Sequence, residues 1–454
     1  MKIKNILLLF ALGLLFACEP KIDTFTTTSG DADFSKYVSI GNSLTAGYAD
    51  GDLYKAGQEV SYPSILAKQF EAAGGGEFKQ PLMYDEYGFG RRLLLDASIP
   101  GPVSAGVSPD ERNFQSIAGF GPYNNMGVPG AKSFHLLVNG YGTLNPYFGR
   151  FASASTTTVL ADALAQNPTF FTLWIGNNDV LAYALTGGTA DSITPMPYFQ
   201  GSIGTILSQL NGIGAKGAVA NIPDITSIPY FSFMNTRLPY NGLVLSAEQA
   251  GQLNYAYQQF ELYLASIGIP YSYGFNFVAG QNAFVIEDKS IPFPDALGVF
   301  RVRQMKAGEL YLLTLPTDSL QNHGMGSVNT AGAQPLPYGI PDKYILSLTE
   351  IQSIATATNA FNGVLENYAN QFGFAYVDMN SKLRAIAQGG VVSDGIPFTS
   401  AFITGNSFSL DGVHMTGKGN ALAANYFIDA INAKYGSVLQ HVNTRLYPGI
   451  YYYQ

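Results

Sequence analysis

The feature that most constrains the fold is the apolar run at residues 168–175, Pro-Thr-Phe-Phe-Thr-Leu-Trp-Ile. A strand that is apolar on both faces is buried on both faces, which is typical of a parallel sheet covered by helices. Similar short runs occupy residues 217–221 and 374–378, and a stretch with helical spacing precedes each of them, at 203–210 and 349–370. Strands that alternate with helices predict βαβ units, and therefore an α/β sheet with helices on both faces.

The same alternation begins near the start of the chain. Residues 37–40 form a short β-prone run that ends in Gly41, and residues 62–71 have helical spacing, with Pro63 suited to a first helical turn. Residues 74–120 contain Gly, Pro and Arg with little periodicity, and we interpret them as a long excursion over the rim of a site at the sheet edge.

An aromatic region punctuated by Gly and Pro, about residues 225–345, separates the last two predicted strands. It predicts a large insertion. One interpretation is a loop-and-hairpin segment that stabilises the sheet edge, and the other is a cap that supplies apolar walls for a substrate. A separately folding domain fits less well, because no polar linker brackets the segment.

The N-terminus has the pattern of an export signal. Lys2 and Lys4 precede an apolar stretch at residues 6–16, which is too short for a permanent bilayer-spanning helix and is followed by Ala17 and Cys18. The sequence Leu-Phe-Ala-Cys at 15–18 resembles a bacterial lipobox. We therefore expect a signal peptide at residues 1–17, a lipidated Cys18, a flexible tether at residues 18–33, and an exported protein anchored to the outer membrane, on its periplasmic or cell-surface face. The alternative is an ordinary cleaved signal with a chance cysteine.

Composition limits the remaining possibilities. Cys18 is the only cysteine, so the mature chain has no internal disulfide and no thiol nucleophile, and its stability must come from a core. The 47% hydrophobic and 12% charged residues are ample for one. A formal net charge of −8 without basic runs argues against nucleic acid as a partner. No later run is long and apolar enough for a transmembrane helix, so any membrane contact is expected through the N-terminal anchor alone.

Two short polar motifs follow predicted strands. Gly-Asn-Ser-Leu at 41–44 places Ser43 on a turn at the carboxyl end of the first strand, where backbone N–H groups converge. A helix N-cap is the plainer interpretation of an isolated serine at such a place. Gly-Asn-Asn-Asp at 176–179 follows the apolar run, and the amide of Asn178 could donate a hydrogen bond to a developing oxyanion. A simple turn is the alternative.

A third motif, Asp-Gly-Val-His at 411–414, precedes the final predicted helix. Thr416 is a plausible N-cap for that helix, whose apolar positions recur at helical spacing. An aspartate three residues before a histidine allows the carboxylate to accept a hydrogen bond from one imidazole nitrogen while the other nitrogen faces a nucleophile. Asp411 and His414 are therefore candidates for a base and the residue that orients it.

The ordered set Gly-x-Ser-Leu, Gly-x-Asn-Asp and Asp-x-x-His resembles the SGNH (GDSL-like) hydrolase superfamily, and the resemblance covers nearly the whole mature chain. It implies a flavodoxin-like three-layer α/β/α sandwich with a mostly parallel central sheet over residues 34–436, interrupted by the large insertion, and a C-terminal extension at 437–454. It also implies a catalytic triad in which Ser43 is the nucleophile, His414 the general base and Asp411 its orienting group. The family's oxyanion hole would use the Ser43 amide, a glycine amide and Asn178.

The glycine of that oxyanion hole must lie within residues 125–133. Similarity to the family's stretch favours Gly130, with Gly127 second, and both could instead be turn glycines. Asn42 occupies the position at which the Gly-Asp-Ser-Leu motif, written in the family name GDSL, has an aspartate. The resemblance implies no cofactor, and no metal motif is present in the sequence. We interpret the other three histidines, His135, His323 and His441, as structural or solvent-facing, and the Asp-Gly-Asp sequence at 50–52 as a solvated turn.

The sequence thus predicts a carboxylic ester hydrolase, a serine esterase or lipase that acts through an acyl-enzyme on a lipid ester or an acetylated glycan. Two alternatives stay open. One is a surface-binding lipoprotein that keeps the fold without turnover, and the other is a carbohydrate O-acetyl esterase or an acyltransferase that uses the same residues.

Overall fold

The computed structural model describes residues 26–96, 101–330, 335–450 and 452–453 of the 454-residue chain. The expected signal peptide, Cys18 and the first part of the expected tether lie outside the described residues. Among the residues described, no helix is both long and apolar enough to cross a bilayer.

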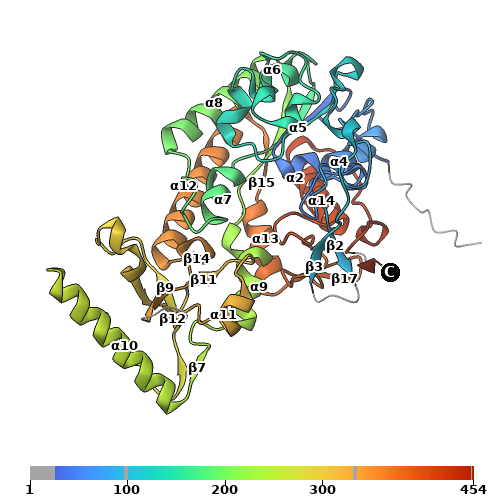
Figure 1. Ribbon diagram of the computed structural model, residues 1–454. Coiled ribbons are helices and arrows are strands. Elements are labelled where there is room, and N and C mark those ends of the chain that lie inside the picture. The colour runs from blue at the N-terminus through green and yellow to red at the C-terminus, as the bar shows by residue number, and fades with distance from the viewer. Residues whose placement is uncertain (1–25, 97–100, 331–334, 451, 454) are drawn as a thin grey trace, which may run out of the picture.

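A five-stranded parallel sheet forms the centre of the molecule (Figure 1). Its strands are β1 (Tyr37–Gly41), β4 (Asn125–Gly127), β5 (Phe170–Trp174), β6 (Lys216–Ala220) and β15 (Ala375–Val377), in the spatial order β15-β6-β5-β1-β4. Counted along the chain, this is the order 2-1-3-4-5 of flavodoxin-like sheets. The predicted three-layer α/β fold with a mostly parallel sheet is confirmed.

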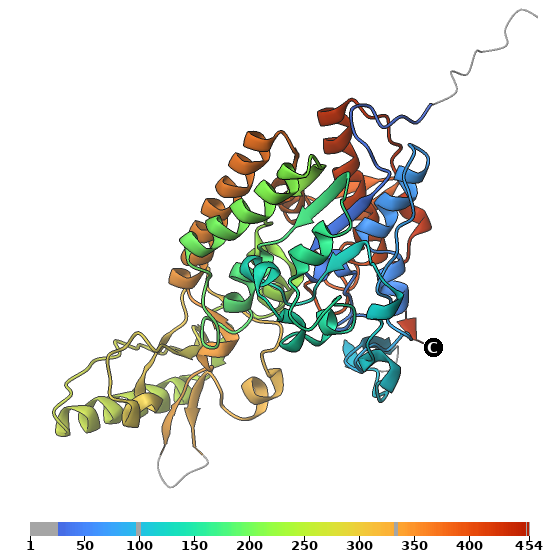
Figure 2. The same ribbon diagram turned by 90° about the horizontal axis from the view of Figure 1, so that it is seen from above.

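Four long helices cover the two faces of the sheet. Helices α4 (Tyr62–Glu71) and α14 (Gly417–Tyr435) pack together on one face, and α8 (Met196–Gly212) and α12 (Leu348–Phe372) pack together on the other (Figures 1 and 2). All five residues of β5 are buried, as the apolar run predicts for a strand covered on both sides. The core on the two faces is partly aromatic: Tyr62 stacks on Phe427, and Phe199 stacks on Phe361.

Capping side chains fix where two of these helices begin. Ser347 and Glu350 form a reciprocal capping box at the start of α12. The Thr416 hydroxyl accepts a hydrogen bond from the Gly419 amide and begins α14, as the sequence predicted. Because the start of α14 is fixed in this way, the loop of residues 411–414 before it has a defined position at the sheet edge.

The shorter elements of the main body connect these layers. The helices are α2 (Ser43–Ala46), α3 (Lys55–Glu59), α5 (Pro146–Gly149), α6 (Val159–Leu164), α7 (Asn177–Ala184) and α13 (Met379–Gln388). A small sheet of order β18-β2-β3 joins β2 (Leu93–Asp96) and β3 (Pro102–Ser104) of the predicted excursion to β18 (Tyr452–Tyr453). A separate two-stranded sheet pairs β16 (Val391–Ser393) with β17 (Ile396–Phe398).

The insertion projects from one end of the body (Figures 1 and 2). It holds the helices α9 (Pro229–Arg237), α10 (Ala247–Ser266) and α11 (Thr317–Asn322), and the short strands β7 (Leu243–Leu245), β8 (Gly280–Asn282), β9 (Val285–Glu287), β10 (Val302–Gln304), β11 (Leu310–Tyr311), β12 (Ser327–Asn329), β13 (Leu336–Tyr338) and β14 (Ile345–Leu346). It has hydrophobic clusters of its own, one of them around Tyr257 and Phe260 and the other around Tyr311. The predicted insertion is confirmed, but a loop-and-hairpin segment does not describe it, because α10 is a helix of 20 residues.

The described part of the expected tether, residues 26–33, packs against the body. Thr28 bridges to Val438, and the Asp31 amide donates to the carbonyl of Tyr435 at the end of α14. Ala32 is buried, and the next aromatic residue, Phe34, stacks on Phe70. The Thr-, Ser- and Asp-rich composition concealed this, because these contacts are made largely by the backbone and to residues about 400 positions away in the chain.

Candidate active site

Ser43 lies at the carboxyl end of β1 and is the first residue of α2. The cap of α2 is Asn42, whose side-chain oxygen accepts from the Leu44 amide at 3.0 Å, so the serine hydroxyl is not needed as a cap. A Cβ atom at Gly41 would overlap the Thr45 side chain and the Trp174 carbonyl, which explains the glycine before this turn. Asn42, which replaces the aspartate of the Gly-Asp-Ser-Leu motif, therefore holds the turn that presents Ser43.

His414 joins Ser43 to Asp411. Its Nε2 lies 2.8 Å from the Ser43 Oγ, and its Nδ1 lies 2.8 Å from the Asp411 Oδ2. The other oxygen of Asp411 accepts from the amides of Val413 and His414, both at 2.8 Å. Burial alone would raise the pKa of Asp411, but the adjacent His414 and these hydrogen bonds outweigh it and lower the pKa well below its usual range. The carboxylate therefore stays ionised.

A turn at residues 50–52 holds this loop from the opposite side. The Gly51 amide donates to the Asp411 Oδ2 at 3.0 Å, and the Asp50 Oδ1 accepts from the Leu410 amide at 3.0 Å. Asp52 is fully buried and accepts from the backbone of Leu53 and Arg91. The Asp-Gly-Asp segment is a turn, as the sequence predicted, but it is not solvated, because Asp52 is buried and Asp50 and Gly51 contact residues about 360 positions away.

Asn178 lies in the first turn of α7, directly after the carboxyl end of β5. Its Nδ2 donates to the Ala131 carbonyl at 2.9 Å. The neighbouring Asp179 is buried and accepts from both the amide and the hydroxyl of Ser133, at 2.8 and 2.7 Å. These bonds tie the loop of residues 128–133 to the start of α7 and fix the position of Asn178 relative to this loop.

The two candidate glycines of the oxyanion hole have different surroundings. Gly127 is buried in β4, where a Cβ atom would overlap the backbone of Ala46. Gly130 has a φ of +79°, is exposed, and lines the same cleft as Ser43 and Asn178. The structure therefore places Gly130 at the cleft and assigns Gly127 a packing role against α2.

The cleft sits where the strand order reverses. β1 and β5 are neighbours, but the next strands of the chain lie on opposite sides of them, and such a switch point is where open α/β sheets hold ligands. The cleft encloses about 390 Å³. Its lining residues include Ser43, Gly130, Asn178 and His414, a wall of Tyr48, Tyr147, Tyr230, Leu181 and Leu185, and Arg91.

Two of these wall residues bear on the expected roles of the excursion and the insertion. Arg91 belongs to the excursion of residues 74–120 and lies at the cleft, as expected for a rim segment. Tyr230 of α9 lines this cleft, and Ile225 and Ile228 at the start of the insertion line a smaller hollow that also includes Ser43 and His414. The insertion thus touches the cleft at its base, and most of it lies elsewhere.

The remaining histidines have other partners. His135 accepts from the Lys132 amide through Nδ1 and stacks on Tyr141, and burial lowers its pKa. His323 and His441 are exposed and pair with Asp318 and Asp429. Across the described ranges, no group of three or more His, Cys, Asp or Glu side chains is arranged to hold a metal ion.

Comparisons with known proteins find structures but no sequence relatives. No family model and no curated protein matches the chain. Three solved structures resemble it at 11% sequence identity each. They are the α/β hydrolase LAE5 from the metagenome of Lake Arreo, Spain (TM-score 0.36, 88% of this chain and 96% of that chain), a protein of Parabacteroides merdae described as GDSL-like lipase (0.34, 90% and 100%), and an extracellular lipase of Streptomyces rimosus (0.32, 87% and 99%).

The strand order of the central sheet defines the fold. That order and the site define an α/β protein of flavodoxin-like topology with a serine, a histidine and an aspartate joined at the switch point of its sheet. In motif order and in topology, the chain resembles the SGNH (GDSL-like) hydrolases.

Proposed function

We propose that this protein is a serine hydrolase that cleaves carboxylic esters through an acyl-enzyme. The observation that carries the proposal is the His414 ring, which lies 2.8 Å from the Ser43 hydroxyl on one side and 2.8 Å from the Asp411 carboxylate on the other. A nucleophile, a base in contact with it and a group that orients the base are the three requirements of this chemistry.

In the first step, the Ser43 Oγ attacks the ester carbonyl carbon and its proton passes to Nε2 of neutral His414. The imidazolium that results is stabilised by ionised Asp411, which accepts from Nδ1–H. His414 then gives its proton to the leaving alcohol as the carbon–oxygen bond breaks, and the acyl group stays on Ser43. In the second half, His414 takes a proton from water, the hydroxide attacks the acyl carbonyl, and the released serine oxygen regains a proton.

The tetrahedral oxyanion needs donors, and three N–H groups of the cleft are suited to it. As the first residue of α2, Ser43 has an amide that the helix itself does not use. The Gly130 backbone lies at the cleft on a turn that its positive φ requires. The side-chain amide of Asn178 has two N–H bonds, and only one is needed for the hydrogen bond to Ala131. We assign the oxyanion hole to these three groups.

The three similar structures, two of them described as lipases and one as an α/β hydrolase, are of the kind proposed here. The apolar and aromatic wall of the cleft suits the acyl or alcohol part of an ester. An acyltransferase would use the same residues and differ only in accepting an alcohol in place of water.

A fluorophosphonate probe tests the nucleophile directly, because it reacts covalently with an activated serine. We expect the wild-type chain to be labelled and Ser43→Ala not to be. Ser208→Ala, at an exposed serine on α8, is the matched control and should label like wild type. Release of p-nitrophenol from esters of increasing chain length then measures turnover. If the wild type is not labelled and releases no p-nitrophenol, the protein is a binding protein on this fold and the proposal is wrong.

A further inference from the structure

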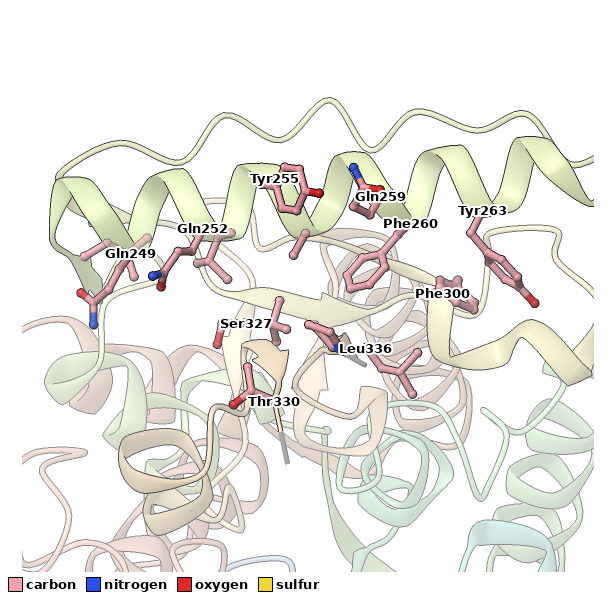
Figure 3. Close-up of a pocket in the computed structure, with 15 residues that line it drawn as sticks. Gln249, Gln252, Tyr255, Gln259, Phe260, Tyr263, Phe300, Ser327, Thr330 and Leu336 are labelled. Carbon is pink, nitrogen blue, oxygen red and sulfur yellow. The ribbon is translucent and has the colours of Figure 1, made fainter. Parts of the chain in front are cut away.

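A large cavity lies in the insertion, away from Ser43. It is a groove of about 770 Å³ between α10 and the strands β12 and β13, and it shares no lining residue with the cleft at Ser43 (Figure 3). Figures 1 and 2 both show α10 on the outside of the insertion, at the end farthest from α2 and α14. The groove is therefore a separate surface and not an extension of the catalytic cleft.

One stripe of α10 forms a wall of this groove. Gln252, Ala256, Gln259 and Tyr263 recur at the spacing of a single helix face, and all four line it (Figure 3). A different stripe, which includes Tyr257 and Leu264, packs into the insertion's own core. In the groove stripe, Ala256 also packs against that core and the Tyr263 ring lies 5.5 Å from the Phe300 ring, whereas Gln252 and Gln259 are exposed. Tyr263 has 47% of its surface exposed, and Tyr255, about two helical turns earlier, has 64%.

The floor and the opposite wall are apolar with hydroxyl groups among them. Phe260 and Phe300 lie between the helix and the hairpin, and Ser327, Thr330 and Leu336 face them from β12 and β13 or beside these strands (Figure 3). None of the described residues that line the groove carries a charge. This is unusual for a surface helix, whose open faces are normally charged, whereas α10 has only Glu248 and Glu261 in 20 residues.

From this lining we infer that the groove binds a neutral oligosaccharide chain. Glutamine amides both donate and accept, which matches neighbouring sugar hydroxyls, and aromatic rings offer flat apolar faces to the C–H face of a sugar ring. The absence of charge favours a neutral chain over an acidic one, since an anion would lose its hydration without gaining a cationic partner. From Gln249 to Tyr263 the helix wall is about 21 Å long, which suits several linked units better than one monosaccharide.

An acyl chain fits this lining less well. The row of glutamine amides along α10 would lose hydrogen bonds to water against a hydrocarbon, and the groove is too separate from Ser43 to hold the acyl group under attack. Taken with the proposed function, on which this step rests, the groove implies that the ester is carried by a glycan. The groove would hold the polymer while the cleft removes an acyl group from it.

Calorimetric titration of the full chain carrying Ser43→Ala measures binding without hydrolysis. The probes are cellohexaose, xylohexaose and mannohexaose, with hexagalacturonate as a charged comparison and dodecanoate as an apolar one. We expect at least one neutral hexasaccharide to bind and the two comparison ligands to bind more weakly. Gln252→Ala with Gln259→Ala, and separately Tyr263→Ala, should weaken that binding by about tenfold or more, as expected when a hydrogen bond or ring contact is lost. Tyr198→Ala, at an exposed tyrosine of α8, is the control and should bind unchanged.

Binding of dodecanoate alone, no binding of any neutral hexasaccharide, or equal binding by the groove variants would overturn the inference. A dimer that dissociates in the same variants would assign the groove to a second copy of the chain instead. The catalytic proposal is judged separately. With Ser43 intact, the groove variants should hydrolyse p-nitrophenyl acetate at the wild-type rate and release acetate from an acetylated form of the bound polysaccharide more slowly. Hexasaccharide binding without any ester hydrolysis would support glycan binding by the groove and refute only the proposed esterase activity.

Discussion

Asp411 contributes to the site through contacts within the protein and not through contact with a substrate. One carboxylate oxygen meets the His414 ring and the Gly51 amide, and the other accepts two amides of its own loop. Only 13% of the Asp411 side chain and 15% of the His414 side chain are exposed. The imidazole is therefore held in one orientation before an ester binds. This arrangement gives Ser43, His414 and Asp411 different roles in the reaction.

The three residues should differ in how much activity their loss removes. Ser43→Ala and His414→Ala should each lower kcat by roughly 10⁶, and Asp411→Asn by roughly 10⁴, because the aspartate orients and stabilises the imidazole without forming or breaking a bond. Steady-state kinetics of the three variants on one p-nitrophenyl ester check the order. Wild-type activity in His414→Ala would require another base and would withdraw the assignment of this loop.

Asn178 should affect a different kinetic parameter from a residue that binds substrate. Asn178→Ala should lower kcat by roughly 10²–10³ with little change in KM, since its amide faces charge that is present only in the transition state. Because Asn178 also bonds to Ala131, a structural loss must be separated from a chemical one. Asn178→Asp loses the donor to Ala131 as well as the donor to the oxyanion, so it should be no more active than the alanine variant, and the unfolding temperature of each variant measures the structural loss. A rise in KM alone would contradict the assignment.

The sequence predicted the site where its parts are close in the chain or follow a strand. Asp411 and His414 are three residues apart, and Ser43 and Asn178 each follow a run that is apolar enough to identify a strand. The support from Asp50 and Gly51 was missed because it depends on contacts across about 360 residues, which a short Asp-Gly-Asp segment does not encode. The choice between Gly127 and Gly130 likewise needed the packing of α2.

At the scale of elements, prediction succeeded where hydrophobic periodicity was strong. The strands β5, β6 and β15 and the helices α8 and α12 lie where apolar runs and helical spacing placed them. The edge strand β4 has only three residues, among them an asparagine and a glycine, so it carries no strand signal. Helix α10 was missed although Ser246 and Gln249 form a capping box, because its tyrosines and glycine weaken the helical signal.

The junction between the insertion and the body should respond to pH through Asp342. Burial, and next the nearby Glu350, raise the pKa of Asp342 to about 6, although Lys289 opposes the shift. The folded state thus binds this proton more tightly than the unfolded chain, whose carboxyl has a pKa of about 3.9. This contribution to stability is complete below that value and is lost as pH rises through about 6.

Asp342→Asn, which cannot ionise, should therefore unfold at nearly the wild-type temperature at pH 4 and at a higher temperature at pH 8, by roughly 2 °C. Its lost ion pair with Lys289 costs little, because the lysine is mostly exposed. Thermal unfolding followed by circular dichroism at both pH values measures the difference. Asp295→Asn, at a fully exposed aspartate, should show no such dependence. A variant that is less stable than wild type at pH 8 would contradict this reasoning.

At the scale of the whole molecule, Cys18 bears on where the protein is held. We propose that Cys18 carries an acyl anchor on an exported protein, because it is the only cysteine and follows a short apolar run. Cys18→Ala should then move the protein from the membrane fraction to the soluble fraction, since buried acyl chains contribute about 0.8 kcal/mol per CH₂. Fractionation followed by immunoblotting tests this, and unchanged membrane association of the variant would refute it.

The packing of residues 28–32 beside the end of α14 also determines which edge of the sheet lies near the proposed anchor. Asp31 contacts Tyr435 and Lys216, at the amino edge of the sheet, whereas Ser43 lies at the carboxyl edge. Eight residue steps separate Cys18 from Thr26, and a fully extended chain of that length spans about 28 Å at most. If Cys18 is anchored as proposed, the attachment lies near the amino edge of the sheet and the cleft lies at the opposite edge. We then expect the cleft to face away from the surface that holds the chain and to act on esters of molecules that approach from the water.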